Sequence, residues 1–585
     1  MSRGRNGLGF VCALVVAVAA ASQAAQAAEG PCEQITAACQ AAGFVRGEAR
    51  SGNGLEVDCV APIIAGTATP ARATKPLPAI DPQVVAACRA RNPRLGQRGS
   101  TASGPANQTP PIPAVPSAPL PSHPAAAGSP NIVFILTDDL AWNLVQFMPH
   151  VLQMQKDGVT FANYFVTDSL CCPSRSSIFT GRYPHDTGVF RNTGADGGYN
   201  AFTRNGLERV TFAAALAAAG YRTAMLGKYL NGYEPAQDPV AIGWSNWAVA
   251  GGGGYGEFRY ALSENGALTR HGTAPGDYLT DVLSGIATRF VGQGGKPFLI
   301  EVATFAPHAP YVPAPRDVAA FPGLRAPRNA AFNAAPEASA PPWLQHMPAL
   351  SDADQAGIDR DFKKRAQSVL AVDQMIGALQ AAVKAAGQAG NTYFVFSSDN
   401  GYHMGEYRLM PGKMTAYDAD IRVPLIITGP GVPAGRVIED FAENTDLCPT
   451  FVELAGASLP APVDGTSLVP LLRGAIQSDE RQAALIEHHH PARDPADPDA
   501  PGARSGNPPS YEAMRTKRAL YVEYADGSKE YHDLASDPDE LHNSYASLAA
   551  AQKEALRAAL AAMANCHDAK ACRAAERPAR LAEAR

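Results

Sequence analysis

Continuous apolar runs are the clearest pattern along this chain. Residues 131–136, 298–303, 393–396 and 424–427 are almost entirely apolar, which is typical of strands buried on both faces of a parallel sheet. Residues 210–219 and 364–386 have the length and composition of helices. Because strands and helices alternate, the pattern predicts an α/β fold in which helices sandwich a large mixed, mostly parallel sheet.

The pattern changes beyond residue 475. Residues 519–523 and 529–532 flank Asp526-Gly527, which is a typical hairpin turn. A helix is expected over residues 548–564. We therefore predict a main domain over residues 131–475 and a smaller α+β subdomain over residues 476–585.

The N-terminal region resembles an export signal. Arg3 and Arg5 precede an apolar stretch over residues 8–21, and Ala25-Gln26-Ala27 fits a cleavage site. The apolar stretch is too short to predict a membrane span, and no later stretch is long enough. We expect a signal peptide over residues 1–27 and a mature protein that is periplasmic or secreted.

Cysteine usage agrees with an oxidising compartment. A small cysteine-rich module is predicted over residues 30–95, followed by a linker rich in Pro and Ala over residues 96–130. The four cysteines of the module (Cys32, Cys39, Cys59 and Cys88) allow three pairings that the sequence does not distinguish. Cys566 and Cys572 are close enough in sequence to close a short loop, and Cys448 is expected to be buried.

Composition narrows the function classes. Of the 585 residues, 46% are hydrophobic and 18% are charged, as in an ordinary globular protein. The net charge of −6 argues against a general nucleic-acid binder, which would carry a basic face. It does not exclude an anionic substrate, because a few local cations are enough to bind one.

Acidic residues directly follow the ends of two predicted strands. Asp138 and Asp139 follow the first strand, and Asp399 and Asn400 follow the strand that ends at Phe396. In open α/β sheets, ligands bind outside the carboxyl ends of the strands. Either turn alone is more typical of a helix cap. Together their oxygen atoms predict a site for calcium or magnesium rather than zinc.

Residues 171–182 read Cys-Cys-Pro-Ser-Arg-Ser-Ser-Ile-Phe-Thr-Gly-Arg. This run resembles the signature of the type I sulfatases, with Phe179 where Leu is usual. In that family the first Cys is oxidised to formylglycine, so the resemblance implies formylglycine at Cys171. A hydrated aldehyde has two hydroxyls, so one can attack sulfur and the other can expel the sulfate. The alternative interpretation is a buried cysteine pair before a proline turn.

Further runs resemble the same family, including residues 227–233, 306–310, 398–403 and 420–425. The chain is most similar to N-acetylglucosamine-6-sulfatases and extracellular heparan endosulfatases. The resemblance implies an alkaline-phosphatase-like fold, a sulfated-sugar or other sulfate-ester substrate, and a formylglycine-generating enzyme as a maturation partner. It implies calcium ligation by Asp138, Asp139, Cys171, Asp399 and Asn400, contact of Arg175 with the formylglycine, sulfate binding by Lys228 and Lys413, and proton donation by His308.

One position departs from the family pattern. Leu230 stands where many sulfatases have the His that assists sulfate release, and we expect His403 to replace it. An arylsulfatase, a phosphonate or phosphodiester hydrolase on the same fold, and an inactive binding protein with unconverted Cys171 remain alternatives. We expect His185 to be structural or to support the site from behind its contacting residues. Residues 488–490 are expected to form a solvated loop, and the alternative is that they touch the substrate.

Overall fold

The computed structural model describes residues 31–44, 55–65, 75–91, 128–475, 481–490, 497 and 499–583. They belong to two compact units, one within residues 1–108 and the other within 109–585. The expected signal peptide and most of the expected linker lie outside the described residues, so the domain boundaries remain predictions. Within the described part, no helix combines the length and apolarity needed to cross a membrane.

The first unit is a small helical module. Its helices are α2 (Pro31–Ala41), α3 (Ala61–Ala65) and α4 (Pro82–Arg91), which surround a core that includes Ile35, Phe44 and Leu55. A disulfide joins Cys39 to Cys59, which settles one bridge among the pairings that the sequence left open. The side chain of Cys32 lies outside the described part.

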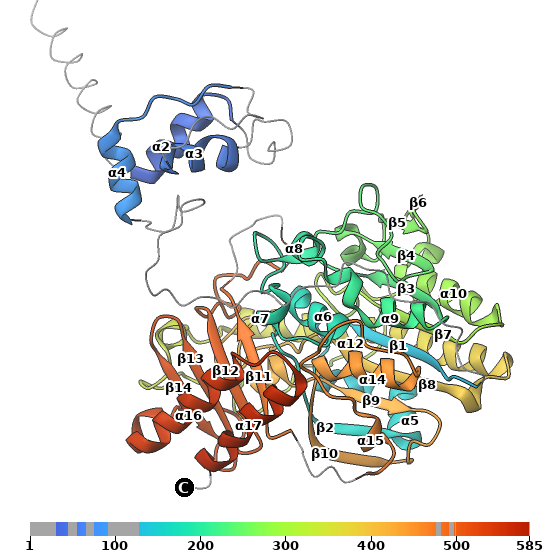
Figure 1. Ribbon diagram of the computed structural model, residues 1–585. Helices are drawn as coiled ribbons and strands as arrows, with labels where there is room; N and C mark the ends of the chain where they lie inside the picture. Colours follow the sequence, from blue (N-terminus) through green and yellow to red (C-terminus); the bar gives the residue numbers. More distant parts are fainter. Residues whose placement is uncertain are drawn as a thin grey trace, which may run out of the picture. The chain divides into compact units, whose positions relative to one another are not determined.

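The second unit is built on a 10-stranded mixed sheet with the order β10-β2-β9-β8-β1-β7-β3-β4-β5-β6 (Figure 1). The central strands β8, β1, β7, β3 and β4 are parallel to one another. Strand β9, the neighbour of β8, is antiparallel to it. The strands are β1 (Asn131–Thr137), β2 (Val159–Phe165), β3 (Arg222–Lys228), β4 (Asn246–Ala250), β5 (Ala261–Glu264), β6 (Ala267–Arg270), β7 (Phe298–Ala303), β8 (Thr392–Ser398), β9 (Leu425–Thr428) and β10 (Arg436–Glu443).

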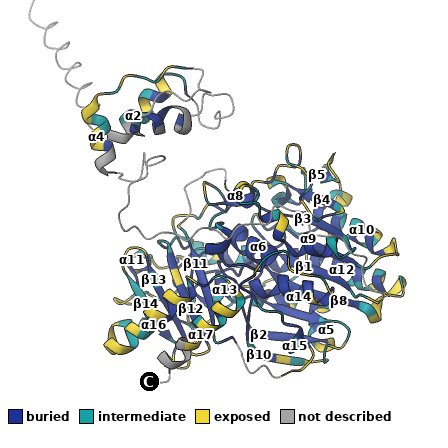
Figure 2. Ribbon diagram, viewed as in Figure 1, coloured by how far each residue is buried: buried dark blue, intermediate teal, exposed yellow. Residues whose placement is uncertain are grey.

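Strand β1 shows why its sequence is apolar throughout. Ile132, Phe134 and Leu136 belong to one core cluster, and Val133 and Ile135 belong to another. Since successive side chains point to opposite faces of a sheet, the strand separates the two cores. The central strands β1, β7 and β8 are buried along their whole length (Figure 2). The predicted α/β sandwich is therefore confirmed.

Helices cover the two faces of the sheet. One core contains side chains of α6 (Cys171–Thr180), α9 (Phe212–Ala218) and α14 (Leu447–Leu454). The other contains side chains of α5 (Pro149–Asp157), α10 (Leu279–Gly292) and α12 (Asp352–Ala385). Shorter helices are α7 (Pro184–Thr187), α8 (Gly198–Arg204), α11 (Pro342–Gln345), α13 (Asp418–Ile421) and α15 (Val469–Leu472).

Helix α12 begins earlier than residue 364, where the sequence predicted its start. Ser351 forms a capping box with Asp354, so both side chains satisfy backbone donors of the first turn. The polar residues that follow remain helical because this cap fixes the start.

The smaller C-terminal α+β part is also confirmed. Its four-stranded sheet has the order β11-β12-β13-β14, and the expected hairpin joins β13 and β14. The elements are β11 (Ala483–His488), β12 (Tyr511–Thr516), β13 (Ala519–Tyr524), β14 (Lys529–Asp533), α16 (Ala550–Met563) and α17 (Ala569–Glu583). Cys566 and Cys572 form a disulfide.

The prediction that residues 488–490 form a solvated loop is wrong for His488. This residue ends β11, is fully buried, and lies 3.1 Å from Asp168. The strand pairing with β12 carries it into the core.

A buried charge network ties the C-terminal part to the main sheet. Arg481 lies 2.8 Å from Asp446 and 3.1 Å from Glu576 of α17, and it also contacts Glu443 at the end of β10. Each member is at most 4% exposed. A buried cation with several carboxylate partners is costly to disrupt, so this network holds the two sheets together.

Candidate active site

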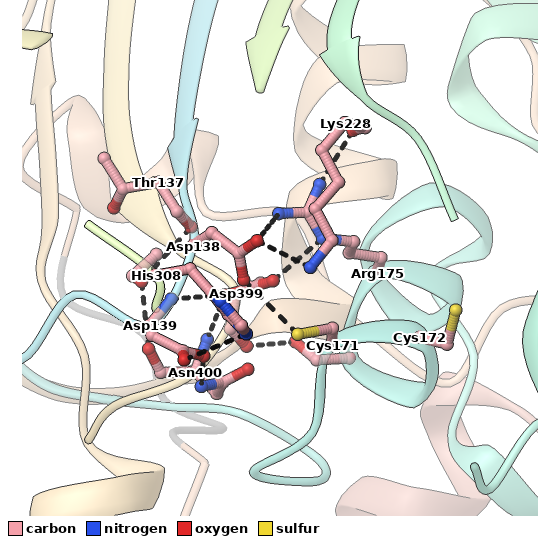
Figure 3. Close-up of polar contacts among 12 residues, drawn as sticks. Thr137, Asp138, Asp139, Cys171, Cys172, Arg175, Lys228, His308, Asp399 and Asn400 are labelled. Atoms are coloured by element: carbon pink, nitrogen blue, oxygen red, sulfur yellow. Dashed lines mark hydrogen bonds and ion pairs between the residues drawn. The ribbon is translucent and has the colours of Figure 1, made fainter. Parts of the chain in front are cut away.

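The two acidic turns meet because β1 and β8 are parallel neighbours. Thr137 pairs with Ser398 in the sheet, so both strands end side by side. The backbone N–H of Asp139 donates to Asp399 Oδ1 at 3.1 Å, and Asn400 Nδ2 donates to Asp139 Oδ1 at 2.7 Å. Figure 3 shows these side chains gathered beside Cys171. The structure thus brings together the turns that the sequence singled out.

Helix α6 carries the cysteine into this cluster. It begins at Cys171, whose Sγ lies 3.3 Å from Asp138 Oδ1. Arg175, one turn later, lies on the same face. Its Nε donates to Asp399 Oδ2 at 2.8 Å, and its Nη1 donates to the carbonyl of Lys228 at 2.8 Å. Among the described residues, Arg175 Nη2 is buried without a hydrogen-bond acceptor, so it is a free donor within the site.

Two lysines supply positive charge. Lys228 Nζ, at the end of β3, lies 2.5 Å from Asp138 Oδ2. Lys413 Nζ lies 2.6 Å from Asp139 Oδ1 and 3.0 Å from Cys171 Sγ. Burial alone would lower the pKa of each lysine, but the nearby carboxylates raise both well above the usual value. Both lysines are therefore cations.

His308 lies on the loop after β7. Its Nδ1 is 2.7 Å from the carbonyl of Ala309, so this nitrogen carries the proton in the neutral ring. Its Nε2 faces the cluster, 3.5 Å from Asp139 Oδ2. Burial would lower the pKa of His308, whereas Asp139 and Asp499 raise it above its ordinary value.

The donor set fits a hard cation. Carboxylates of Asp138, Asp139 and Asp399 converge, and Asp138 and Asp139 group with Cys171 and His308 as possible metal ligands. Asn400 Oδ1 is buried and has no hydrogen-bond partner in the described part of the chain. An orphaned buried amide oxygen beside carboxylates suits calcium or magnesium, which prefer oxygen ligands.

The adjacent cysteine points away from the cluster (Figure 3). Cys172 Sγ accepts a hydrogen bond from the backbone N–H of Asn231 at 3.0 Å. Burial and the neighbouring acids raise the pKa of the Cys171 thiol well above its usual value, so an unmodified Cys171 would stay protonated and be a weak nucleophile.

His403 is not brought to the same point. It is 1% exposed, and its Nδ1 lies 2.9 Å from Asp420. Within the described residues, its hydrogen-bond and ion-pair partners do not include the acidic cluster. Leu230, which replaces the usual His, is buried in the apolar core.

Asp499 was missed by sequence reasoning. It lies between β11 and β12, and its Oδ1 lies 2.5 Å from His308 Nε2 and 2.7 Å from Lys413 Nζ. Its surroundings, rich in Pro, Asp and Ala, match no motif. No pattern in the residues around it predicts that it reaches the site.

A cavity of about 240 Å³ opens beside the cluster and is lined by Asp139, His308, Lys413 and Asp499. A larger cavity, of about 670 Å³, lies where Asn131, Arg222 and Phe298 begin their strands. We assign the site to the smaller one, because ligands bind at the carboxyl ends of strands.

Comparisons with known proteins agree with this site. The sulfatase family model matches residues 130–457, more than half of the chain, and a model of the C-terminal part of N-sulphoglucosamine sulphohydrolases matches residues 405–565. Human N-acetylglucosamine-6-sulfatase is 35% identical over 454 residues, covering 72% of this chain and 82% of the relative. A putative extracellular sulfatase Sulf-1 homologue of Caenorhabditis elegans is 34% identical over 365 residues, covering 61% of this chain and 51% of the relative.

Solved structures show the same fold. The structure of BT4656 in complex with its substrate D-glucosamine-2-N,6-O-disulfate matches with a TM-score of 0.61 at 23% sequence identity. The match covers 74% of this chain and 97% of the BT4656 chain. The phosphonate monoester hydrolase of Agrobacterium radiobacter has a TM-score of 0.58 at 24% identity, covering 74% of this chain and 96% of the hydrolase chain.

Carboxylates, buried cations and a cysteine gathered at the carboxyl ends of the strands of a mixed α/β sheet form a site suited to an enzyme that hydrolyses anionic esters. The family match makes this class specific. The chain belongs to the sulfatase family and is a sulfuric ester hydrolase.

Proposed function

We propose that this protein hydrolyses a sulfate ester of a sulfated sugar, of the 6-O-sulfo-glucosamine type, using a formylglycine at position 171 and a bound calcium ion. The observation that carries the proposal is the position of Cys171. The first residue of the sulfatase signature lies within hydrogen-bonding distance of both Asp138 and Lys413, where carboxylates and cations converge.

The calcium ion, held by Asp138, Asp139, residue 171, Asp399 and Asn400, would supply positive charge, and the hydrated formylglycine would supply a hydroxyl nucleophile. Arg175 is anchored by Asp399, and its free Nη2 is available to an oxygen on residue 171. Lys228 and Lys413 enter the site from two different segments and bind the sulfate oxygens. Fixed cations in a water-poor site stabilise the charge that develops on the transferring group.

His308 is the proton donor to the leaving alcohol. Its Nδ1 is held by Ala309, so its Nε2 is the atom that faces the substrate. Burial would lower the pKa of His308, but Asp139 and Asp499 raise it above its ordinary value, which favours the protonated ring that a general acid requires. His403 is kept as the candidate for assisting sulfate release, although its ring is held by Asp420 and, in the described part of the chain, does not contact the acidic cluster.

The sugar preference rests on the similarity to the human enzyme, whose name specifies N-acetylglucosamine 6-sulfate. Export to the periplasm or the medium is supported by the disulfides Cys39–Cys59 and Cys566–Cys572, since such bonds persist in oxidising compartments. A formylglycine-generating enzyme is the required maturation partner.

A substrate panel tests the proposal. The purified protein, with formylglycine verified by peptide mass spectrometry, is assayed on sugars sulfated at defined positions, on an aryl sulfate and on an aryl phosphonate. We expect the highest kcat/KM on 6-O-sulfated glucosamine units. Faster turnover of the aryl sulfate than of every sugar would contradict the sugar assignment, and a preference for the phosphonate would contradict the sulfatase activity.

A further inference from the structure

We infer that the Asp499 carboxylate occupies the sulfate subsite of this protein and competes with substrate sulfate for the same donors. This inference rests on the proposed function, because it takes Lys413 and His308 as groups that bind the sulfate ester. It concerns a residue between β11 and β12 that no motif marks.

The first carboxylate oxygen is bound by the groups that the reaction needs. Asp499 Oδ1 lies 2.5 Å from His308 Nε2 and 2.7 Å from Lys413 Nζ. His308 Nε2 is the nitrogen that would face the leaving oxygen, since Nδ1 is taken by Ala309. Asp499 therefore occupies the place where the ester oxygen and a sulfate oxygen would lie.

The second oxygen is saturated as well. Asp499 Oδ2 accepts hydrogen bonds from Asn192 Nδ2 and Asn231 Nδ2, both at 2.8 Å, and Tyr255 Oη lies 3.5 Å away. The side chain of Asp499 is fully buried. Donors converging on a buried anion form an oxyanion site, and here the anion belongs to the protein itself.

The carboxylate is charged. Burial would raise the pKa of Asp499, but Lys413 and His308 hold it well below its ordinary value. A sulfate ester is also an anion, so both groups in one place would repel each other strongly in a buried site. Sulfate and this carboxylate therefore exclude one another.

The hydrogen-bond capacity of Lys413 leads to the same conclusion. An ammonium group has three donors, and Lys413 Nζ already contacts Asp139, Cys171 and Asp499. A sulfate oxygen can accept a hydrogen bond from Lys413 only if it replaces one of these three partners. Asp139 is a proposed metal ligand and residue 171 the nucleophile, so Asp499 is the partner that is replaced.

The competition has a consequence for substrate choice. Every sulfate ester must offset the loss of the Asp499 contacts, and a small ester has only its sulfate with which to do so. The sugar part of a sugar sulfate would in addition fill the adjacent cavity of about 240 Å³. The carboxylate thus selects against small sulfate esters and inorganic sulfate.

Sulfate binding to the calcium-loaded, formylglycine-containing protein tests this inference. Isothermal titration with inorganic sulfate compares wild type with Asp499→Asn, Asp499→Ala and the matched control Asp497→Asn. Asp497 lies in the same segment, and its Oδ1 accepts from the backbone of Asp499, a contact that Asn preserves. KM for an aryl sulfate is measured in parallel, and thermal melting checks that each variant is folded.

Removal of the Asp499 charge should tighten sulfate binding by about tenfold or more, because a like charge leaves a buried site. Asp497→Asn should change it by no more than about threefold, since this carboxylate is not in contact with the sulfate donors. Unchanged or weaker sulfate binding in both folded Asp499 variants would overturn the inference. A fall in kcat without tighter binding would also overturn it and assign Asp499 to catalysis instead. Tighter sulfate binding without turnover of any ester would support the competition and reject the proposed hydrolysis.

Discussion

The adjacent cysteines allow a sharp test, because Cys171→Ala and Cys172→Ala make the same chemical change one residue apart. Cys171 contacts Asp138 and Lys413 in the cluster, whereas Cys172 packs away from it against Asn231. Loss of the nucleophile should lower kcat/KM by about 10⁵-fold or more, as for other enzymes that lose theirs. Cys172→Ala should retain a substantial fraction of activity.

The expected cost of Cys172→Ala is one of stability. The Cys172 sulfur is fully buried, and its removal leaves a small cavity and the Asn231 N–H without an acceptor. Together these effects cost about 1–3 kcal/mol of unfolding free energy. Cys172→Ser keeps an acceptor at this position and should recover part of the loss.

The assays are kcat/KM on an aryl sulfate, thermal unfolding, and peptide mass spectrometry of residues 171 and 172. The active protein should contain the aldehyde at position 171 and an intact thiol at 172. Full activity with an unmodified Cys171, or a folded Cys172→Ala protein without activity, would refute the reasoning.

Other parts of the structure give further predictions. Chelation should abolish activity, and calcium should restore it better than zinc; Asp399→Asn should lower kcat/KM by about 100-fold or more, with Asp526→Asn on the exposed hairpin as the unaffected control. Burial would lower the pKa of His185, but Glu487 at 2.8 Å raises it from 6.5 to about 10. The contribution of the His185–Glu487 ion pair to the free energy of unfolding is therefore complete below pH 6.5 and is lost as the pH rises to 10. The stability difference between wild type and His185→Gln, at most about 5 kcal/mol, should shrink over this range in denaturant titrations; a constant difference would contradict it. Arg481→Ala should cost about 3–5 kcal/mol in the same titrations, and a loss below about 1 kcal/mol would show that the network is not stabilising.

The sequence predicted those parts of the site that depend on local pattern. The apolar run of β1 placed Asp138 and Asp139 at a strand end, and the run of β8 did the same for Asp399 and Asn400. Parallel pairing then brings the turns together. The sheet itself was predictable because buried strands on both faces leave a strong hydrophobic signal.

Asp499 was not predictable in the same way. Its partners His308, Lys413 and Asn231 are distant in sequence and meet it only through the tertiary structure. A short acidic stretch between prolines is more typical of a solvated loop. His488 was misjudged for a related reason, because only the pairing of β11 with β12 shows that it is buried.

The burial of Cys171 orders the events of biosynthesis. The residue is fully buried at the start of a helix whose residues are all buried, so no enzyme can reach its sulfur in the folded protein. If residue 171 is converted to formylglycine as proposed, the conversion must therefore happen while the chain is still unfolded, during or just after synthesis. On that proposal, a molecule that folds before conversion would be left without its nucleophile, and the active fraction of a preparation would report how much of the chain was converted before it folded.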